Sequence, residues 1–99
     1  MIIAPTPENS AFFSALASEV RLKIIQLLSK EDLNIKELAS KIGVSSPIML
    51  KHVQILENAG IIITRLVKKN GSTNRVCTLV FAEYRLMIAT RRRGFPIAT

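Results

Sequence analysis

Apolar residues recur at intervals of three and four positions over the first sixty residues of the chain. This spacing places them on one side of an α-helix and leaves charged residues on the other side. The pattern predicts four helices, over residues 11–17, 18–30, 34–42 and 46–59. The predicted inward positions are Phe12, Phe13 and Leu16 in the first helix, Val20, Ile24, Leu27 and Leu28 in the second, Ile35, Leu38, Ala39 and Ile42 in the third, and Met49, Val53 and Leu56 in the fourth.

Residues that favour helix ends stand where the first two helices begin. Asn9 or Ser10 can cap the first helix, and Ser18 suits the start of the second. Pro5 and Pro7 keep the N-terminus extended, because a residue before proline is disfavoured in the helical region. In the second helix, the predicted exposed side carries Arg21, Lys23 and Lys30.

Only a short break separates the third helix from the fourth. Residues 34–37 resemble a capping box with asparagine in the Ser/Thr position, and Gly43 is the expected left-handed end of the helix. Ser46 can cap the next helix, with Pro47 at its first position, where a missing N–H is tolerated. Two helices joined by so tight a turn form a helix-turn-helix, whose second helix can enter the major groove of DNA. Such pairs also occur as plain packing units.

The hydrophobic period changes from helical to alternating in the second half of the chain. Residues 61–67 and 75–79 alternate and flank a polar turn at 69–72, which predicts a β-hairpin. The tip of this hairpin is basic. A basic hairpin directly after a helix-turn-helix indicates a wing that grips the adjacent DNA backbone.

Residues 15–25, 35–39 and 51–60 resemble the ArsR-type winged-helix transcriptional regulators. The most specific segment is the last, where a histidine follows a basic residue and Ala59-Gly60 leads into a hydrophobic strand. The resemblance covers roughly residues 11–80. It implies an α+β, mainly α fold, the winged helix-turn-helix, with about four helices, a hairpin wing and a C-terminal helix or strand. It also implies a homodimeric, sequence-specific regulator of transcription, a repressor, that binds double-stranded DNA.

The chain departs from that family at two places. Metal-sensing members carry a cysteine pair on the helix that here contains residues 36–39, or His/Asp clusters near the C-terminus, and this sequence has neither. The resemblance therefore does not imply metal sensing. Pro47, Ile48 and Leu50 stand where relatives commonly have small polar residues, so these positions favour apolar contact with thymine methyl groups over hydrogen bonding.

The residues predicted to contact DNA come from the start and outward face of the fourth helix and from the hairpin tip. Lys51 and Gln54 lie three apart on the side away from the apolar stripe, where they can reach phosphates and base edges. Hydroxyl groups at the helix start suit phosphate oxygens. The complete set is Ser45, Ser46, Pro47, Ile48, Leu50, Lys51, His52, Gln54, Lys68, Lys69, Asn70, Ser72, Thr73, Asn74 and Arg75.

The single histidine and the single cysteine, although chemically reactive residue types, are expected to have structural roles. His52 lies near the edge of the apolar stripe, so a half-buried, hydrogen-bonded ring is favoured over a base reader. Cys77 is expected to point with Arg75 and Leu79 and to pack without reacting. One cysteine and one histidine support neither a disulfide scaffold nor a zinc site. The sequence carries no catalytic set and no phosphate-binding glycine loop, so we expect neither an enzyme nor a cofactor.

Composition agrees with a nucleic-acid partner. Fourteen Lys and Arg against seven Asp and Glu give a net charge of +7, and the cations crowd the second half of the 99-residue chain. A basic surface of this kind suits a polyanion, although a solvated surface is the plain alternative. No apolar run approaches the roughly 18–20 residues of a membrane span, so we expect a cytoplasmic protein with no membrane segment.

We divide the chain into an extended arm (1–10), a winged-helix domain (11–80) and a C-terminal segment (81–99) that forms a dimerisation element or a linker to a further domain. Residues 81–88 fit either a helix or a strand. Arg91 to Arg93 form a basic tail that contacts phosphates or acts as a solvated linker. A winged helix that binds protein, or one that binds RNA, remains an alternative to the DNA-binding regulator.

Overall fold

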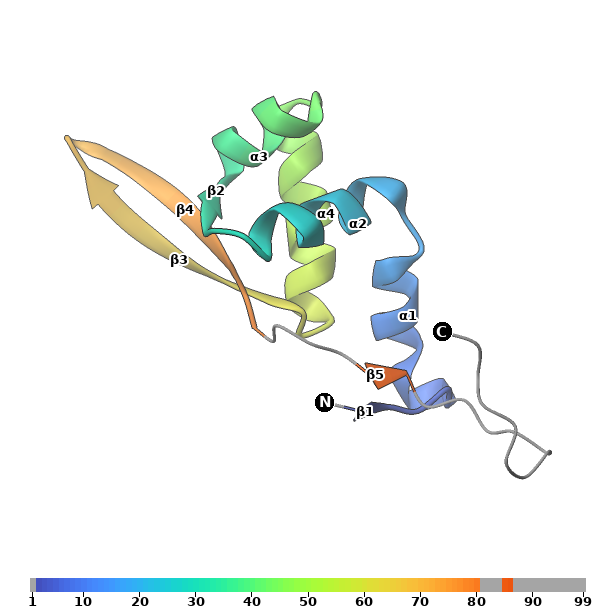
Figure 1. Ribbon diagram of the computed structural model, residues 1–99. Helices are drawn as coiled ribbons and strands as arrows, with labels where there is room; N and C mark the ends of the chain where they lie inside the picture. The colour runs from blue at the N-terminus through green and yellow to red at the C-terminus, as the bar shows by residue number, and fades with distance from the viewer. Residues whose placement is uncertain (1, 81–84, 87–99) are drawn as a thin grey trace.

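The computed structural model describes residues 2–80, 85 and 86 (Figure 1). Its helices are α1 (Ser10–Leu16), α2 (Glu19–Leu28), α3 (Ile35–Ile42) and α4 (Ser46–Asn58), preceded by a 3₁₀ turn, η1 (Pro7–Asn9). Strands β2 (Leu33–Asn34), β3 (Ile62–Lys69) and β4 (Ser72–Leu79) form an antiparallel sheet in the order β2-β4-β3. Strand β1 (Ile2–Ile3) pairs in parallel with β5 (Arg85–Leu86). Four helices with a hairpin wing confirm the predicted fold class.

The first two helices differ slightly from the prediction. Helix α1 begins one residue earlier than predicted, and α2 ends at Leu28 instead of near residue 30. Asn9 occupies the capping position of α1, but its Nδ2 donates to the carbonyl of Ala4 (2.8 Å) and to Thr6 Oγ1 (3.3 Å). Asn9 is thus the N-cap residue, as predicted, but its side chain makes no capping hydrogen bond and its amide secures the N-terminal arm instead. Ser18 does cap α2, as its Oγ accepts from the backbone N–H of residue 21 at 3.3 Å.

The capping box of α3 is confirmed. Asn34 Oδ1 accepts from the backbone N–H of Glu37 at 2.8 Å, and Glu37 Oε1 accepts from the backbone N–H of Asn34 at 2.9 Å. The helix ends at Gly43, whose φ of +88° is the left-handed conformation that glycine adopts without strain. The capping box therefore determines where α3 begins, and Gly43 determines where it ends and how soon α4 can begin.

The hairpin is longer than the sequence pattern predicts. Strands β3 and β4 pair over their full lengths, from Ile62 opposite Leu79 to Lys69 opposite Ser72. Asn70 (φ 51°) and Gly71 (φ 79°) form the two-residue turn, and positive φ at both positions suits the twist of a tight hairpin. The two-residue strand β2, which the pattern did not predict, adds a third strand along β4.

The core lies between the helices and the base of the hairpin. Helix α1 contributes Ala15 as its fully buried residue, while the predicted Phe12 and Leu16 pack partly against the core. Arg21, predicted to lie on the exposed side of α2, is half-buried because its side chain reaches back over the end of α1. The buried hydrophobic residues are Ala15, Ile24, Leu28, Leu33, Leu38, Ala39, Met49, Val53, Leu56, Ile61, Ile62 and Cys77.

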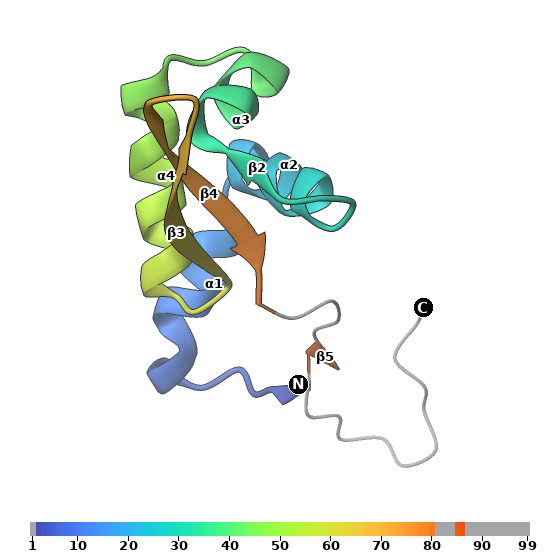
Figure 2. The same ribbon diagram turned by 90° about the vertical axis from the view of Figure 1, so that its left-hand side faces the viewer.

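Two views of the ribbon show how the hairpin is placed. In Figure 1 the hairpin projects away from the helices, and its tip lies at the same end of the molecule as α3 and the first turn of α4. Figure 2, turned by 90°, shows the same arrangement, with the hairpin crossing in front of α4. The wing and the start of α4 therefore face the same region of space.

Some expectations stay predictions. Nothing tests the division at residues 10 and 80. The helix-or-strand question for residues 81–88 and the basic tail at 91–93 lie outside the described residues, apart from strand β5. In the part of the chain that is described, no helix has the length and apolar character needed to span a bilayer.

Candidate nucleic-acid interface

The start of α4 is capped one residue earlier than predicted. Ser45 is the capping residue, and its Oγ accepts from the backbone N–H of Ile48 at 3.4 Å. Ser46 is thus the first residue of the helix, and Pro47 takes the second position. The prediction that Ser46 caps the helix is wrong, because Ser45 is the last residue with an extended backbone before the helix; Pro47 at the second position has no N–H, so the Ser45 hydroxyl bonds the third residue, Ile48. The Ser46 hydroxyl is consequently not used by the cap.

Helix α4 presents the outward face that its sequence predicts. Met49, Val53 and Leu56 are completely buried, which fixes the rotation of the helix about its axis. Lys51 and Gln54 point to the opposite side and are exposed. An apolar flank runs beside them.

That flank is formed by two exposed isoleucines. Ile48 keeps 49% of its surface exposed and Ile55 keeps 40%, whereas Leu50 is half-buried. Large apolar side chains exposed on an otherwise polar helix face are available for contact with another molecule. The predicted set included Ile48 and Leu50 but missed Ile55, which the helical spacing of seven residues could have indicated.

The wing residues of the predicted set lie at the distal end of the hairpin. Lys68, Lys69, Asn70, Ser72, Thr73 and Arg75 are exposed, and Asn74 is half-buried. The exposed side chains among them are accessible to a partner at the end of the molecule that also carries the start of α4.

A chain of hydrogen bonds ties the wing to the end of α4. Arg75 Nη1 donates to Thr64 Oγ1 at 3.1 Å, and the Thr64 hydroxyl donates to Glu57 Oε2 at 2.8 Å. The three residues come from β4, β3 and α4. Glu57 and Thr64 were not predicted to belong to the site, although alternate residues of a strand lie on the same face of the sheet. These two hydrogen bonds hold the Arg75 side chain in a defined direction.

A recess lies between the starts of α3 and α4 and the wing, with a volume of about 390 Å³. It brings six residues of the predicted set together, three from α4 and three from β4. It does not include Lys51, Gln54, Lys68 or Lys69, which are exposed elsewhere on α4 and β3. The lining residues are Asn34, Ile35, Lys36, Ser46, Pro47, Leu50, Thr73, Asn74 and Arg75.

Asn34, Ile35 and Lys36 were not predicted to belong to the site. They reach the recess because β2 pairs with β4, with Asn34 opposite Val76, so α3 starts directly beside the wing. A two-residue strand leaves almost no periodic signal in the sequence. The basic residue inside the capping box, Lys36, was the available indication.

A hydrogen bond joins His52 of α4 to α2. Arg21 Nη1 lies 3.0 Å from His52 Nδ1, and the same guanidinium donates through Nε to the carbonyl of Ala15 at 2.7 Å. The half-buried, hydrogen-bonded histidine favoured by the sequence is confirmed. Burial, together with the positive charge of Arg21, lowers the pKa of His52. Only Nε2 of this ring remains for a DNA contact.

Cys77 is completely buried opposite Leu33 of β2. Burial raises the pKa of its thiol to about 11, and the carboxylate of Glu57 adds to the shift. The reactive form of a cysteine is the thiolate, so this thiol is inert at neutral pH. The predicted packing position is confirmed. No group of His, Cys, Asp and Glu within residues 2–80, 85 and 86 is arranged to hold a metal ion.

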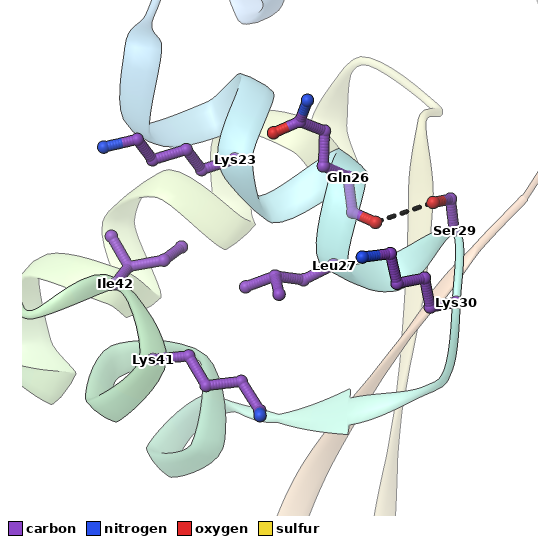
Figure 3. Close-up of a pocket in the computed structure, with 7 residues that line it drawn as sticks. All are labelled: Lys23, Gln26, Leu27, Ser29, Lys30, Lys41 and Ile42. Carbon is purple, nitrogen blue, oxygen red and sulfur yellow. Dashed lines mark hydrogen bonds between the residues drawn. The ribbon is translucent and has the colours of Figure 1, made fainter.

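A second cavity, of about 610 Å³, lies between the second half of α2 and the end of α3 (Figure 3). Figure 3 shows Leu27 and Ile42 pointing toward each other across it, with Lys30 and Lys41 at its sides. Both lysines stand in or just after the last turn of a helix, where a cation offsets the negative end of the helix dipole. No residue of the predicted set lines this cavity.

Comparison with known proteins agrees with this architecture. Residues 18–64 match the family described as bacterial regulatory protein, arsR family. An uncharacterized HTH-type transcriptional regulator of Methanocaldococcus jannaschii, MJ0229, is 34% identical over 62 residues, which are 63% of this chain and 65% of that protein. The match therefore spans just under two thirds of the length of this curated relative.

Solved structures of regulators have the same fold. HlyU from Vibrio cholerae N16961 shares 28% identity with a TM-score of 0.61, over 75% of this chain and 80% of its own. The ArsR family transcriptional regulator RHA00566 shares 31% identity with a TM-score of 0.62, over 78% and 76%. The homodimeric winged helix-turn-helix DNA-binding domain of Mb0332 from Mycobacterium bovis, at 19% identity and a TM-score of 0.63 over 73% and 63%, supports the fold alone.

Proposed function

Residues 18–64 of this chain belong to the arsR family of bacterial regulatory proteins, and from that premise we propose that the protein is a transcriptional regulator that binds specific sequences of double-stranded DNA. Helix α4 lies in the major groove and the wing lies on the adjacent backbone. The regulator acts as a homodimeric repressor in the cytoplasm and has no enzymatic activity.

The observation that carries the proposal is the common orientation of α4 and the wing. The tip of the hairpin and the first turn of α4 occupy the same end of the molecule in both views (Figures 1 and 2). The residues predicted to contact DNA include Lys51, Lys68, Lys69 and Arg75 and no Asp or Glu. Cations on a helix and a hairpin that face the same way suit the phosphates on either side of a groove.

Selection from a random duplex pool, followed by a salt titration on the recovered site, tests the proposal. We expect one sequence to be enriched. We also expect log K to fall with log salt with a slope of about −3.6 or steeper, since each neutralised phosphate contributes about −0.9. Absence of binding to every duplex, together with a flat salt dependence, would contradict it.

The exposed Ile48 and Ile55 favour a second candidate, a winged helix that binds another protein through α4. Contact of that kind depends on apolar area and changes little with salt. The double variant Ile48→Ser/Ile55→Ser separates the two. It would abolish protein binding, whereas DNA binding would keep its salt slope. A single-stranded RNA of the selected sequence serves as the competitor that tests for an RNA-binding winged helix.

A further inference from the structure

The recess beside the start of α4 occupies a defined place in the proposed complex. Each edge of the major groove is a sugar–phosphate backbone, so a protein that has α4 in the groove and its wing on the adjacent backbone brings that backbone strand against the surface between α4 and the wing. The recess of about 390 Å³ is lined by residues of α4 and of β4, with the start of α3 closing one side. The strand that passes between α4 and the wing must cross it.

Two cations, Lys36 and Arg75, line the recess. Lys36 of α3 is exposed, and its side chain makes no hydrogen bond or ion pair with any other residue in the described part of the chain. Arg75 of β4 uses one donor, Nη1, on Thr64, and a guanidinium has five N–H donors. Both side chains therefore have donors left for an anion, and Arg75 is already directed by its bond to Thr64.

The remaining lining suits the sugar that accompanies a phosphate. Ile35, Pro47 and Leu50 supply apolar surface, and Ser46 supplies a hydroxyl that the cap of α4 does not use. A deoxyribose presents mostly C–H groups, which pack on apolar side chains, whereas its phosphate requires donors. The recess thus combines the two kinds of surface that one backbone unit needs.

We propose that this recess binds a single backbone phosphate of duplex DNA, and that Lys36, together with Arg75, holds it and so sets the register of α4 in the groove. The inference rests on the proposed function and adds to it a site and a residue, Lys36, outside the set predicted from sequence. The contact carries no sequence information of its own, because every nucleotide has the same phosphate. It fixes which bases the outward face of α4 meets.

The cavity of Figure 3 supplies a matched control. Lys41 lies on the same helix as Lys36, is exposed like it, and makes no hydrogen bond or ion pair in the described part of the chain. It stands in the last turn of α3 and lines the cavity between α2 and α3 instead of the recess. Lys36→Gln and Lys41→Gln remove the same charge from the same helix. A difference in DNA affinity between the two variants is therefore due to the position of the lysine and not to the net charge.

The experiment is a double-mutant cycle between the protein and the DNA. Duplexes of the selected sequence carry one uncharged methylphosphonate at each backbone position in turn, and each is titrated with wild type, Lys36→Gln and Lys41→Gln. We expect Lys36→Gln to weaken binding by up to about fivefold, the upper end of the range for an exposed charge pair. We expect one methylphosphonate position to weaken wild type by at least this factor and to have a smaller effect on Lys36→Gln, in which Arg75 alone still contacts the phosphate. That position keeps its effect on Lys41→Gln.

The outcomes separate this inference from the function on which it rests. If wild type binds its selected duplex but every methylphosphonate weakens Lys36→Gln as much as wild type, Lys36 does not hold a phosphate and the recess assignment is wrong, while the function stands. If Lys36→Gln and Lys41→Gln behave alike, the effect is one of net charge and the assignment is also wrong. If no duplex binds wild type, the proposed function fails as well. Thermal unfolding of each variant confirms that the fold is kept, since both substitutions are on the helix surface.

Discussion

The guanidinium of Arg21 donates to Nδ1 of His52 at 3.0 Å and thereby joins α2 to α4 across 31 positions of the chain. A guanidinium has donors only, so Nδ1 of the ring accepts and the proton of the neutral ring is on Nε2. The same guanidinium binds the carbonyls of Ala15 (2.7 Å) and Ser14 (3.2 Å). One side chain therefore links the end of α1, the start of α2 and the middle of α4.

This relationship predicts a loss of stability in mild acid. The pKa of His52 lies below its ordinary value of 6.5, because burial and then the charge of Arg21 disfavour the protonated ring. The unfolded chain takes up the proton more readily than the folded one. The contribution to stability is therefore complete above about pH 6.5 and is lost as the pH falls from there through the lower pKa of the folded protein.

Thermal unfolding between pH 8 and pH 5 measures this effect, and His52→Gln should remove the part of the pH dependence that the ring causes. The chain has one histidine, so its NMR titration needs no assignment. Arg21→Gln should raise the pKa of His52 while leaving the effect of burial. A native pKa at or above 6.5 in wild type would contradict the argument.

Cys77 predicts a second pH effect, on the alkaline side. Because burial raises the thiol pKa from 9.0 to about 11, the unfolded chain ionises first, and stability is lost as the pH rises above about 9. At pH 8 we expect a thiol reagent to label the single cysteine of the native protein slowly, and urea to accelerate labelling by opening the fold. Labelling of the native protein as fast as of the unfolded chain would show that β4 does not cover this thiol.

The lysines of the wing are expected to supply affinity that does not depend on sequence. A lysine ammonium is a point charge at an exposed tip, and it pairs with phosphate without selecting a base. Lys68→Ala/Lys69→Ala should weaken all duplexes by a similar factor and flatten the salt slope by about 1.8 units, at about 0.9 for each lost phosphate contact. The control is Lys30→Ala/Lys41→Ala, which removes the same charge at the cavity of Figure 3. A loss confined to one sequence would make the wing a base reader.

Gln54 is expected to select a base. Glutamine can pair with adenine N6 and N7, a contact that discriminates by about 1–3 kcal/mol. Gln54→Ala should relax the preference at one position of the selected site and leave nonspecific binding and the salt slope nearly unchanged. Gln26→Ala, at an exposed glutamine of α2, is the control. An unchanged preference at every position would mean that α4 is docked differently, with Ile48 and Leu50 against a protein.

The elements that the sequence predicts well are those determined by local chemistry. The capping box at Asn34 and the left-handed Gly43 act within a few residues, and the spacing of Met49, Val53 and Leu56 fixes which side of α4 is outward. The shift of the α4 cap by one residue, from Ser46 to Ser45, arose because two adjacent serines offer the same chemistry.

The features that the sequence could not give depend on contacts between distant segments. Arg21 was placed on the exposed side of α2 because its charge fits solvent, whereas its partners, Ala15 and His52, come from α1 and α4. Strand β2 has two residues and no period to detect. Lys36 lies at the recess only because that strand pairs with β4. One of the two cations of the candidate phosphate site therefore depends on tertiary structure.

Asn34 belongs to two structures at once. It is the last residue of β2, opposite Val76, and it caps α3 through Glu37, so no spacer exists between the sheet and the helix-turn-helix. An insertion at this junction would separate the two parts that must meet the same duplex, whereas residues added between Asn70 and Gly71 would only lengthen the turn. Insertions and deletions are thus tolerated best at the hairpin tip. There the reach of the wing along a duplex can be lengthened or shortened, by evolution or by design, without altering how α4 is held.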